Sequence, residues 1–364
     1  MKVHRILSFV MVPILAFSIF GCEREQENVV EENETLIIEK NDDTESNDIS
    51  VTEDESSVSE SLPIESETSE TTEETNIPYS EGLSYMSLGD GTAYVVGMGT
   101  CTDSIVSIPP VTPDGDTVVK VAGGFGSIGD GYEIDTFYEC QTITSIVIPD
   151  TVTAIGNAAF SGCRNLTSVV IPDSVVSIGN GAFSGCSNLS SINIPYGVEV
   201  ISQSVFHECS SLTNIVIPDS VTVIDTTAFA NCNSLTSVQL SANLVSLGTS
   251  SFKNCTNLTN IVIPDSVTMI AAGVFEGCSN LTDVTIPTGC TTFGTIIFLD
   301  CNSLQTVNGI SMLEWAESLD LSSYTVARGI GFDNLCSLES LYSSSDSNSM
   351  AEYFVEIITD TAIR

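Results

Sequence analysis

The chain has 364 residues, and 48 Asp and Glu against nine Lys and Arg give it a formal net charge of −39. A chain with this charge repels phosphate backbones and anionic lipid headgroups, which excludes nucleic acid as a partner and electrostatic attachment to a membrane. Any membrane contact must therefore come from another property of the chain.

Residues 1–21 have the pattern of a secretory signal peptide. Lys2 and Arg5 precede an apolar run, Ile6–Phe20, that is shorter than the roughly 17 to 25 residues of a membrane-spanning helix. The stretch "ILAFSIFGC" is similar to the bacterial lipoprotein signal, which implies cleavage before Cys22 and lipidation of that cysteine. The resemblance predicts an exported protein that is anchored at the bacterial cell envelope by its N-terminal lipid only. Ordinary secretion with a free Cys22 is the alternative.

Residues 22–78 are dominated by Glu, Asp, Ser, Thr and Asn and contain no aromatic residue. Such a segment buries too little apolar surface to offset the entropy lost on ordering. We predict an acidic, disordered tether with a mean reach of roughly 40 Å.

A 23-residue repeat follows, and it decides the fold class. Cysteines recur at this step, each three residues after a phenylalanine of the series Phe137 to Phe298 and three before an aliphatic residue. The series is Cys140, Cys163, Cys186, Cys209, Cys232, Cys255, Cys278 and Cys301. A fixed period in this range with apolar columns predicts a leucine-rich repeat solenoid over residues 137–308, with a parallel β-sheet.

Each unit has a local interpretation. "LTSVVIP" alternates apolar and polar residues and predicts a strand, and "PDS" predicts a turn. "VVSIG" predicts a second short extended piece, and "NGAFSGC" a helical or 3₁₀ segment that leads to the next unit. The partial column Asp150, Asp173, Asp219 and Asp265 belongs to these turns, although its acidic character also fits calcium.

The recurring cysteine has four possible roles. Equivalent residues of a solenoid stack about 4.8 Å apart with parallel Cβ vectors, which suits neither a tetrahedral zinc site nor a disulfide. Nucleophilic catalysis needs a base, and the chain has only His4 and His207. We therefore predict a structural ladder of buried thiols and no enzyme, metal or cofactor. The redox states of Cys101 and Cys336 stay open.

The two ends depart from the repeat. Residues 79–136 contain "TAYVVGMGTCTDSIVSIPP", which predicts an atypical first repeat and N-terminal cap. Residues 309–364 predict a degenerate repeat, C-terminal cap and tail. Trp315 lies in a segment that suits a cap, "LCSLESL" reads as a decayed unit, and "EYFVEIITD" predicts one more strand.

Strand alternation predicts a ligand-binding face. Between the two buried residues of each strand, one side chain points outward. This exposed column comprises Val147, Val170, Asn193, Val216, Gln239, Val262 and Thr285, followed by Asn308. Eight rungs make a nearly uncharged strip roughly 35 Å long on the concave sheet. It lacks aromatic platforms for sugars, which favours a protein partner. The alternative is that valine is present only because it suits strands.

The repeat resembles the BspA-like leucine-rich repeats of bacterial surface proteins, near "C-x-x-L-x-x-I-x-I-P-x-x-V-x-x-I-G-x-x-A-F-x-G-C". The resemblance covers Phe137 to Val307, with departures at Leu240–Ala242, Tyr196 and Thr288. It implies a cell-surface adhesin that binds host matrix or another microbial surface. A structural or scaffolding envelope lipoprotein without a host ligand is the alternative.

Overall fold

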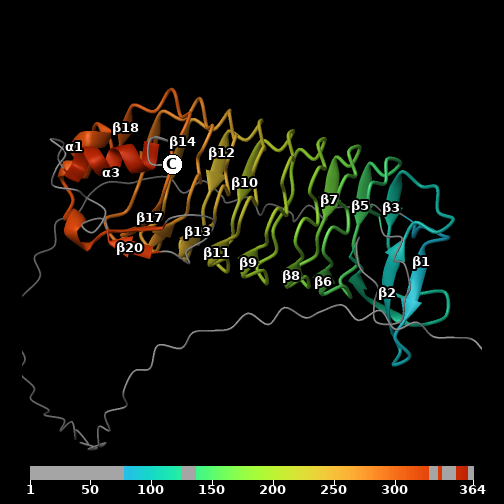
Figure 1. The fold of residues 1–364 in the computed structure, drawn as a ribbon. Coiled ribbons are helices and arrows are strands. Elements are labelled where there is room, and N and C mark those ends of the chain that lie inside the picture. Colours follow the sequence, from blue (N-terminus) through green and yellow to red (C-terminus); the bar gives the residue numbers. More distant parts are fainter. Residues whose placement is uncertain (1–77, 124–136, 328–334, 338–349, 360–364) are drawn as a thin grey trace, which may run out of the picture. The chain divides into compact units, whose positions relative to one another are not determined.

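The computed structural model describes residues 78–123, 137–327, 335–337 and 350–359, all within one compact unit, Thr72–Arg364. The predicted signal peptide, Cys22 and nearly all of the predicted tether lie outside the described residues. Figure 1 shows short strands and turns stacked as rungs of a solenoid, which confirms the predicted fold class.

Longer strands form one side of the rungs, which we call the long-strand face. They are β3 (Ile105–Ser107), β5 (Ser145–Val147), β7 (Ser168–Val170), β10 (Asn214–Val216), β12 (Ser237–Gln239), β14 (Asn260–Val262), β16 (Asp283–Thr285) and β18 (Thr306–Val307). Pairing is parallel, and from β5 onward paired residues are 23 apart, as in Ser145 with Ser168. The strands form three sheets, β3-β5-β7, β10-β12 and β14-β16-β18.

Shorter strands form a second side, the short-strand face. They are β4 (Thr117–Val121), β6 (Ala154–Ile155), β8 (Ser177–Ile178), β9 (Val200–Ile201), β11 (Val223–Ile224), β13 (Ser246–Leu247), β15 (Met269–Ile270), β17 (Thr292–Gly294) and β19 (Thr325–Ala327). They belong to two sheets that end at β8 and at β9. Both strand faces are therefore interrupted between the same two rungs.

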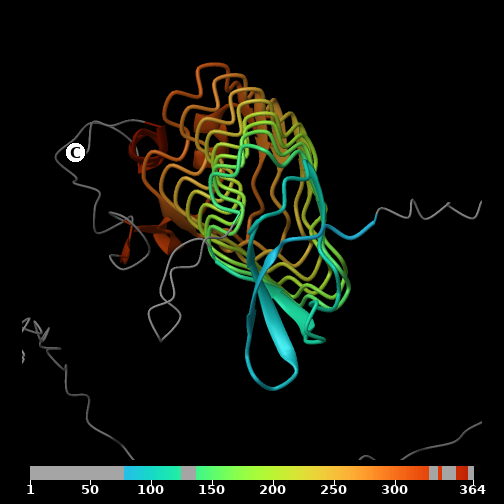
Figure 2. The same ribbon diagram turned by 90° about the vertical axis from the view of Figure 1, so that its right-hand side faces the viewer.

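The third side, the turn face, carries the segments that lead through each Phe to the Cys three residues later. Figure 2 looks along the solenoid and shows its rungs superimposed as closed turns. The helical segment predicted for "NGAFSGC" is wrong, because residues 137–308 contain turns and no helix. Ala158 and Gly162 have φ of 51° and 75°, and such left-handed residues interrupt a helix. Alternate N–H groups then donate to the next rung, as from Phe160 to the carbonyl of Ala182 at 2.8 Å.

The core consists of stacked columns. The phenylalanine rings from Phe137 to Phe298 stack with centroids 5.2 to 5.9 Å apart, and the aliphatic residues of both strand faces pack beside them. Each rung buries its apolar side chains mainly against its neighbours, so the rungs stabilise one another.

A hairpin closes the N-terminal end. Strands β1 (Ser84–Ser87) and β2 (Thr92–Gly97) pair antiparallel, and β2 leads the short-strand face by pairing with β4. Ser80 covers the edge of β3, because its N–H donates to the carbonyl of Ser107 at 2.8 Å and its hydroxyl accepts from the Ser107 N–H at 3.1 Å. The first rung thus has few open backbone groups on this edge.

Two helices and an antiparallel strand lie at the other end. Helix α1 (Met312–Glu317) begins at Ser311 with a capping box, and η1 (Leu321–Ser323) leads into β19. Strand β20 (Leu335–Ser337) pairs antiparallel with β19, so "LCSLESL" does not form another parallel rung.

Helix α3 (Met350–Thr359) stands where "EYFVEIITD" predicted a strand. Phe354, Ile357 and Ile358 are buried at helical spacing, and the Phe354 ring contacts Phe293 at a centroid distance of 5.3 Å. The helix end also takes the place of a rung, because the Ile296 and Phe298 N–H groups donate to the carbonyls of Ile357 and Ile358, both at 2.9 Å. No helix in the described part of the chain is long and apolar enough to span a bilayer.

Candidate functional site

The long-strand face exposes the column of side chains that alternation predicts. Val170, Val216 and Val262 are 55%, 57% and 65% exposed, which is unusual for valines in strands. Asn193 and Gln239 are also exposed, whereas Val147 and Thr285 are half-buried. The column is uncharged and combines valines with Asn, Gln and Thr.

The rung between β7 and β10 forms no strand, although residues 191–193 have the sequence pattern of one. The side chain of Asn193, rather than the backbone of a strand, binds the preceding rung. The Asn193 amide accepts from the Ile171 N–H at 3.4 Å and donates to the Ile171 carbonyl at 2.8 Å. Two rungs later, the equivalent N–H, that of Ile217, donates to a backbone carbonyl of the next rung, that of Gln239. The Asn193 side chain therefore replaces a backbone partner.

The short-strand face is open at the same place. Strands β8 and β9 are not paired, and the Ser202 hydroxyl donates to the Ile178 carbonyl at 2.5 Å. In other rungs a serine after Pro-Asp also bridges to the preceding rung, as Ser220 does to the Val198 carbonyl at 2.8 Å. Gly197 occupies that position here and has no hydroxyl to donate.

The turn face holds these two rungs together. The N–H groups of Gly181, Phe183 and Gly185 donate across the junction at 2.7 to 2.9 Å, and the Cys209 thiol donates to the Phe183 carbonyl at 3.2 Å. The two rungs are thus joined regularly on one side. On the other two sides they are joined through side chains and one long backbone bond, from the Ser190 N–H to the Thr167 carbonyl at 3.5 Å.

A groove of 590 Å³ lies on the long-strand face at this junction. Val170, Ile192 and Val216 line its apolar part, and Tyr196 lines it with 76% of its surface exposed. Residues that line the groove include no charged side chain. We call it the Tyr196 groove.

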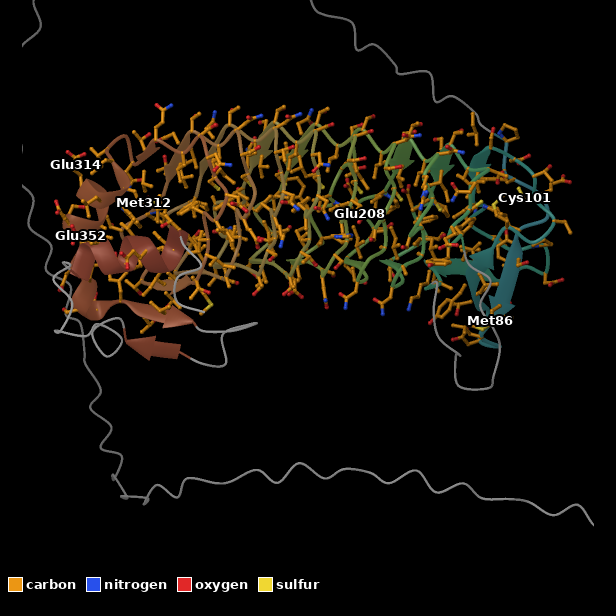
Figure 3. The ribbon with its side chains drawn as sticks, turned by 45° about the horizontal axis from the view of Figure 1, so that its top comes forward. Met86, Cys101, Glu208, Met312, Glu314 and Glu352 are labelled. Carbon is orange, nitrogen blue, oxygen red and sulfur yellow. The ribbon has the colours of Figure 1, made fainter. Side chains whose placement is uncertain are left out.

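A second hollow, of 660 Å³, lies on the turn face. Small residues such as Ser161 and Ser184 line it, together with Glu139, Arg164 and Glu208. Figure 3 shows Glu208 midway between the labelled residues of the two ends. This hollow is polar and carries both signs of charge.

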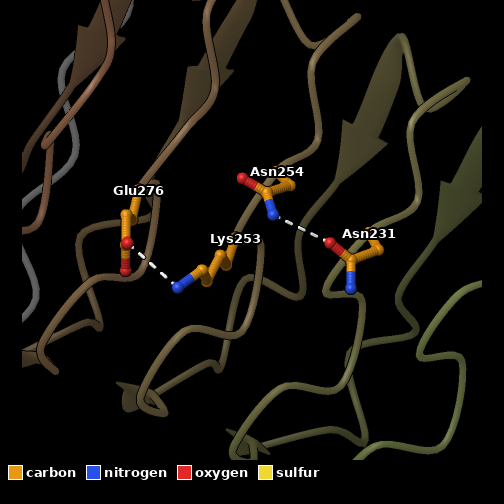
Figure 4. A network of polar contacts seen from close by, with 4 residues as sticks. All are labelled: Asn231, Lys253, Asn254 and Glu276. Atoms are coloured by element: carbon orange, nitrogen blue, oxygen red, sulfur yellow. Dashed lines mark hydrogen bonds and ion pairs between the residues drawn. The ribbon is translucent and has the colours of Figure 1, made fainter.

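The next rungs of the turn face carry a polar row. Lys253 donates to a carboxylate oxygen of Glu276 at 2.9 Å, and the Asn254 amide donates to Asn231 at 2.9 Å (Figure 4). The Asn231 amide also lies 3.2 Å from Nε2 of His207, which is half-buried. These contacts join neighbouring rungs.

The cysteines of the ladder are free thiols in this structure. Cys163 to Cys278 are fully buried, and Cys140 and Cys301 at the two ends are half-buried. From Cys163 onward each thiol donates to the carbonyl of the phenylalanine 26 residues earlier, at 2.8 to 3.3 Å. Burial raises the pKa of the Cys163 and Cys232 thiols from 9.0 to about 12. Neutral thiols of this kind are poor nucleophiles.

The described residues contain no cluster of three or more His, Cys, Asp or Glu side chains arranged to hold a metal ion. Cys101 is buried and free, and the side chain of Cys336 lies outside the description.

The sequence matches the description "BspA type Leucine rich repeat region" in six copies, over residues 132–225 and 199–318. Together these matches span more than half of the chain. It belongs to the BspA-type leucine-rich repeat family.

Solved structures of leucine-rich repeat proteins resemble this BspA-type chain. A protein of T. pallidum is 27% identical, with 61% of this chain and 88% of that one covered at a TM-score of 0.42. A protein of Bacteroides ovatus is 24% identical, with 69% and 78% covered at 0.40. A leucine-rich cell surface protein of Faecalibacterium prausnitzii is 21% identical, with 64% and 94% covered at 0.33. Comparison with curated proteins finds no match.

Sequence reasoning missed Tyr196 as a surface feature of this BspA-type solenoid. The residue departs from Pro-Asp, but a departure from a repeat does not by itself say where the side chain points. The signal was present, because Tyr196 is the only tyrosine between residues 139 and 323.

Proposed function

We propose that this BspA-type protein is a binding module of the bacterial cell surface that recognises a protein partner, on a host or on another microbe, through the long-strand face. The exposed valine column carries the proposal, since Val170, Val216 and Val262 each keep more than half of their surface exposed. Clustered exposed apolar residues mark interaction sites more often than chance. Family membership supports the surface location.

The test is a pull-down with the detergent-solubilised full-length chain against host matrix proteins and bacterial surface fractions. Simultaneous replacement of Val170, Val216 and Val262 by Lys is expected to abolish capture without changing the circular dichroism spectrum or melting temperature. Glu208→Gln on the turn face is the matched control. If the lysine variant captures the same partner while charge changes at His207 and Lys253 abolish capture, recognition belongs to the turn face.

A structural or scaffolding role without a host ligand is the second candidate. It is favoured if the chain captures only components of its own envelope, and capture that survives the lysine substitutions would support it further. An enzymatic role has no support in the described residues, because the buried thiols lack a neighbouring base and are held neutral.

We infer an N-terminal lipid anchor at Cys22 from the signal-like sequence before it. A diacylglycerol supplies two chains, and two chains anchor stably where one does not. Cys22→Ser is expected to move the protein from the membrane fraction to the soluble fraction and to leave the melting temperature of the solenoid unchanged. Unchanged membrane retention of this variant would refute the anchor.

A further inference from the structure

We propose that the Tyr196 groove is the recognition centre of the long-strand face and takes a segment of the partner in which an aliphatic side chain stands beside an arginine or lysine. This inference rests on the proposed function, because it assumes a protein partner on that face. It adds the position of the centre and the chemistry of the segment.

Departures from the repeat converge on this groove. In three other rungs, those of Asp173, Asp219 and Asp265, proline is followed by Asp-Ser, whereas here it is followed by Tyr196 and Gly197. In addition, the Asn193 side chain makes hydrogen bonds to Ile171 where a backbone group would otherwise do so. The turn forms with Asp and Ser elsewhere, so the fold does not require tyrosine here. The same junction is the one at which both strand faces are interrupted.

Tyr196 has the properties of an interface anchor. It is 76% exposed, whereas the phenylalanines from Phe137 to Phe298 are buried. Between residues 139 and 308, all of which the structure describes, it is the only exposed aromatic residue. Tyrosine is enriched among the residues that dominate binding energy, because it combines a large apolar area with a hydroxyl.

The groove beside Tyr196 selects an apolar side chain. Val170, Ile192 and Val216 form its apolar lining, and a cation inserted among them would meet no lining carboxylate. An aliphatic group loses no hydrogen bond on entering such a site, whereas a polar group does.

The rim selects a cation next to that apolar group. Asp173 and Asp219 occupy the position of Tyr196 in the rungs on either side, and both are exposed. Rungs are about 4.8 Å apart, so the backbone position of Tyr196 lies between the positions of two acidic residues. The Asp219 carboxylate accepts from the Ala242 N–H at 2.8 Å, so one of its oxygens is held toward the rung beyond and the other is left for solvent or a ligand. A guanidinium or ammonium beside the ring would be attracted by the face of the ring and by the negative charge of these two exposed residues.

Charge argues against the other occupants of an apolar groove. The predicted tether, residues 22–78, carries Arg24 and Lys40 against a large excess of Glu and Asp, and a second copy brings the same net charge of −39. Both are repelled by the acidic rim. A basic partner is attracted by it.

The direct test uses fluorescein-labelled peptides and the detergent-solubilised full-length chain, with fluorescence anisotropy as the readout. The probe GRLKVG combines cations with aliphatic side chains, GELEVG reverses the charges, and GRGKGG removes the aliphatic groups. GRLKVG is expected to bind at least about tenfold more tightly than either control, and more weakly as salt rises from about 50 to 500 mM. Equal binding of the three peptides, or no binding of GRLKVG, overturns the proposal.

Tyr196→Asp is the decisive variant because it restores the Pro-Asp turn of neighbouring rungs. It should keep the wild-type melting temperature and lose about tenfold or more in affinity for GRLKVG, in the range expected for an aromatic anchor. Asp173→Asn with Asp219→Asn should weaken binding and flatten its salt dependence, whereas Glu208→Gln on the turn face should change neither. Wild-type affinity of Tyr196→Asp overturns the proposal.

Failure of this inference and failure of the proposed function have different signatures. A captured partner that is lost with the three lysine substitutions but retained by Tyr196→Asp leaves the long-strand face as the binding surface and removes the groove as its centre. If both variants still capture the partner, then neither the long-strand face nor the Tyr196 groove is the binding surface.

Discussion

The junction between the rungs of Phe183 and Phe206 differs from the junction between the rungs of Phe229 and Phe252. At the second, the short strands β11 and β13 pair and the phenylalanine rings stack at 5.2 Å. At the first, neither strand face is paired across the junction, yet the rings still stack, at 5.9 Å. The buried column of the turn face thus continues where strand pairing stops, and the Asn193 and Ser202 side chains bridge the two strand faces there.

The largest effect is expected from pH, because it acts on the column that both junctions share. Burial raises the thiol pKa values in the folded state, to about 12 for Cys163 and Cys232 and well above 9.0 for Cys209 and Cys255. Their stabilising contribution is complete below the unfolded-state pKa and is lost as pH rises toward the folded-state values. Each buried thiol should cost about 1.4 kcal/mol per pH unit in that window.

Thermal unfolding followed by circular dichroism between pH 7 and about 11 measures this effect. The melting temperature should fall steeply above pH about 9, and replacing Cys209 by Ala should make the fall shallower. In the same preparation at neutral pH, alkylation should spare Cys186, Cys209 and Cys232 until the chain unfolds. A flat melting temperature up to pH about 11 would contradict the buried-thiol account.

Phe206→Ala should cost about 3 to 5 kcal/mol, because it removes a buried ring from the column and leaves a cavity. Phe252→Ala is the matched control, because the short strand of its rung, β13, pairs with the short strands of both neighbouring rungs. We expect similar total losses, measured by urea unfolding, but a split transition for Phe206→Ala only. Solenoid stability is a sum of rung and nearest-neighbour terms, so breaking the weaker junction should let its two sides unfold separately.

A single cooperative transition for Phe206→Ala would mean that the side-chain bonds of the first junction couple the rungs as firmly as a backbone ladder. A loss below about 1 kcal/mol would place the ring outside the core.

Asn193→Ala should cost about 1 to 2 kcal/mol, because it leaves the partly buried N–H and carbonyl of Ile171 without their partner. Asn214→Ala one rung later is the control, since that amide contacts only its exposed neighbour Thr213. It should cost less than about 0.5 kcal/mol. Equal losses in urea unfolding would show that the amide does not replace the backbone ladder.

Lys253→Gln should have the smallest effect, at most about 1 kcal/mol, because the ion pair with Glu276 is partly exposed to solvent. The difference from wild type should vanish as salt rises, since solvent-exposed charges are screened. A loss that high salt leaves unchanged would point to packing by the lysine stem instead.

The columns of Phe, Cys and Leu made the solenoid predictable, because a 23-residue period leaves few ways to bury them. The turn conformation was less predictable, since "NGAFSGC" suits a helix until left-handed residues such as Ala158 and Gly162 are seen. Helix α3 was misjudged because "EYFVEIITD" has β-prone residues, and docking onto the last rung decides its conformation.

The candidate site was predictable only in part. Alternation places Val170, Val216 and Val262 outward in any strand, and the structure has them exposed. The Tyr196 groove lies where backbone pairs fail to form between rungs, beside the side-chain contacts of Asn193 and Ser202. The residue pattern within one repeat unit does not show which backbone pairs form between neighbouring units.

Helix α3 also limits the length of the assembly. A solenoid is a one-dimensional lattice, and the donors of a final rung are a template on which another chain can add. The carbonyls of Ile357 and Ile358 accept the hydrogen bonds of the Ile296 and Phe298 N–H groups. These N–H groups are therefore not available to the backbone of an added rung from another chain. The helix thus removes, on the turn face at this end, a template on which the repeat of another chain could add.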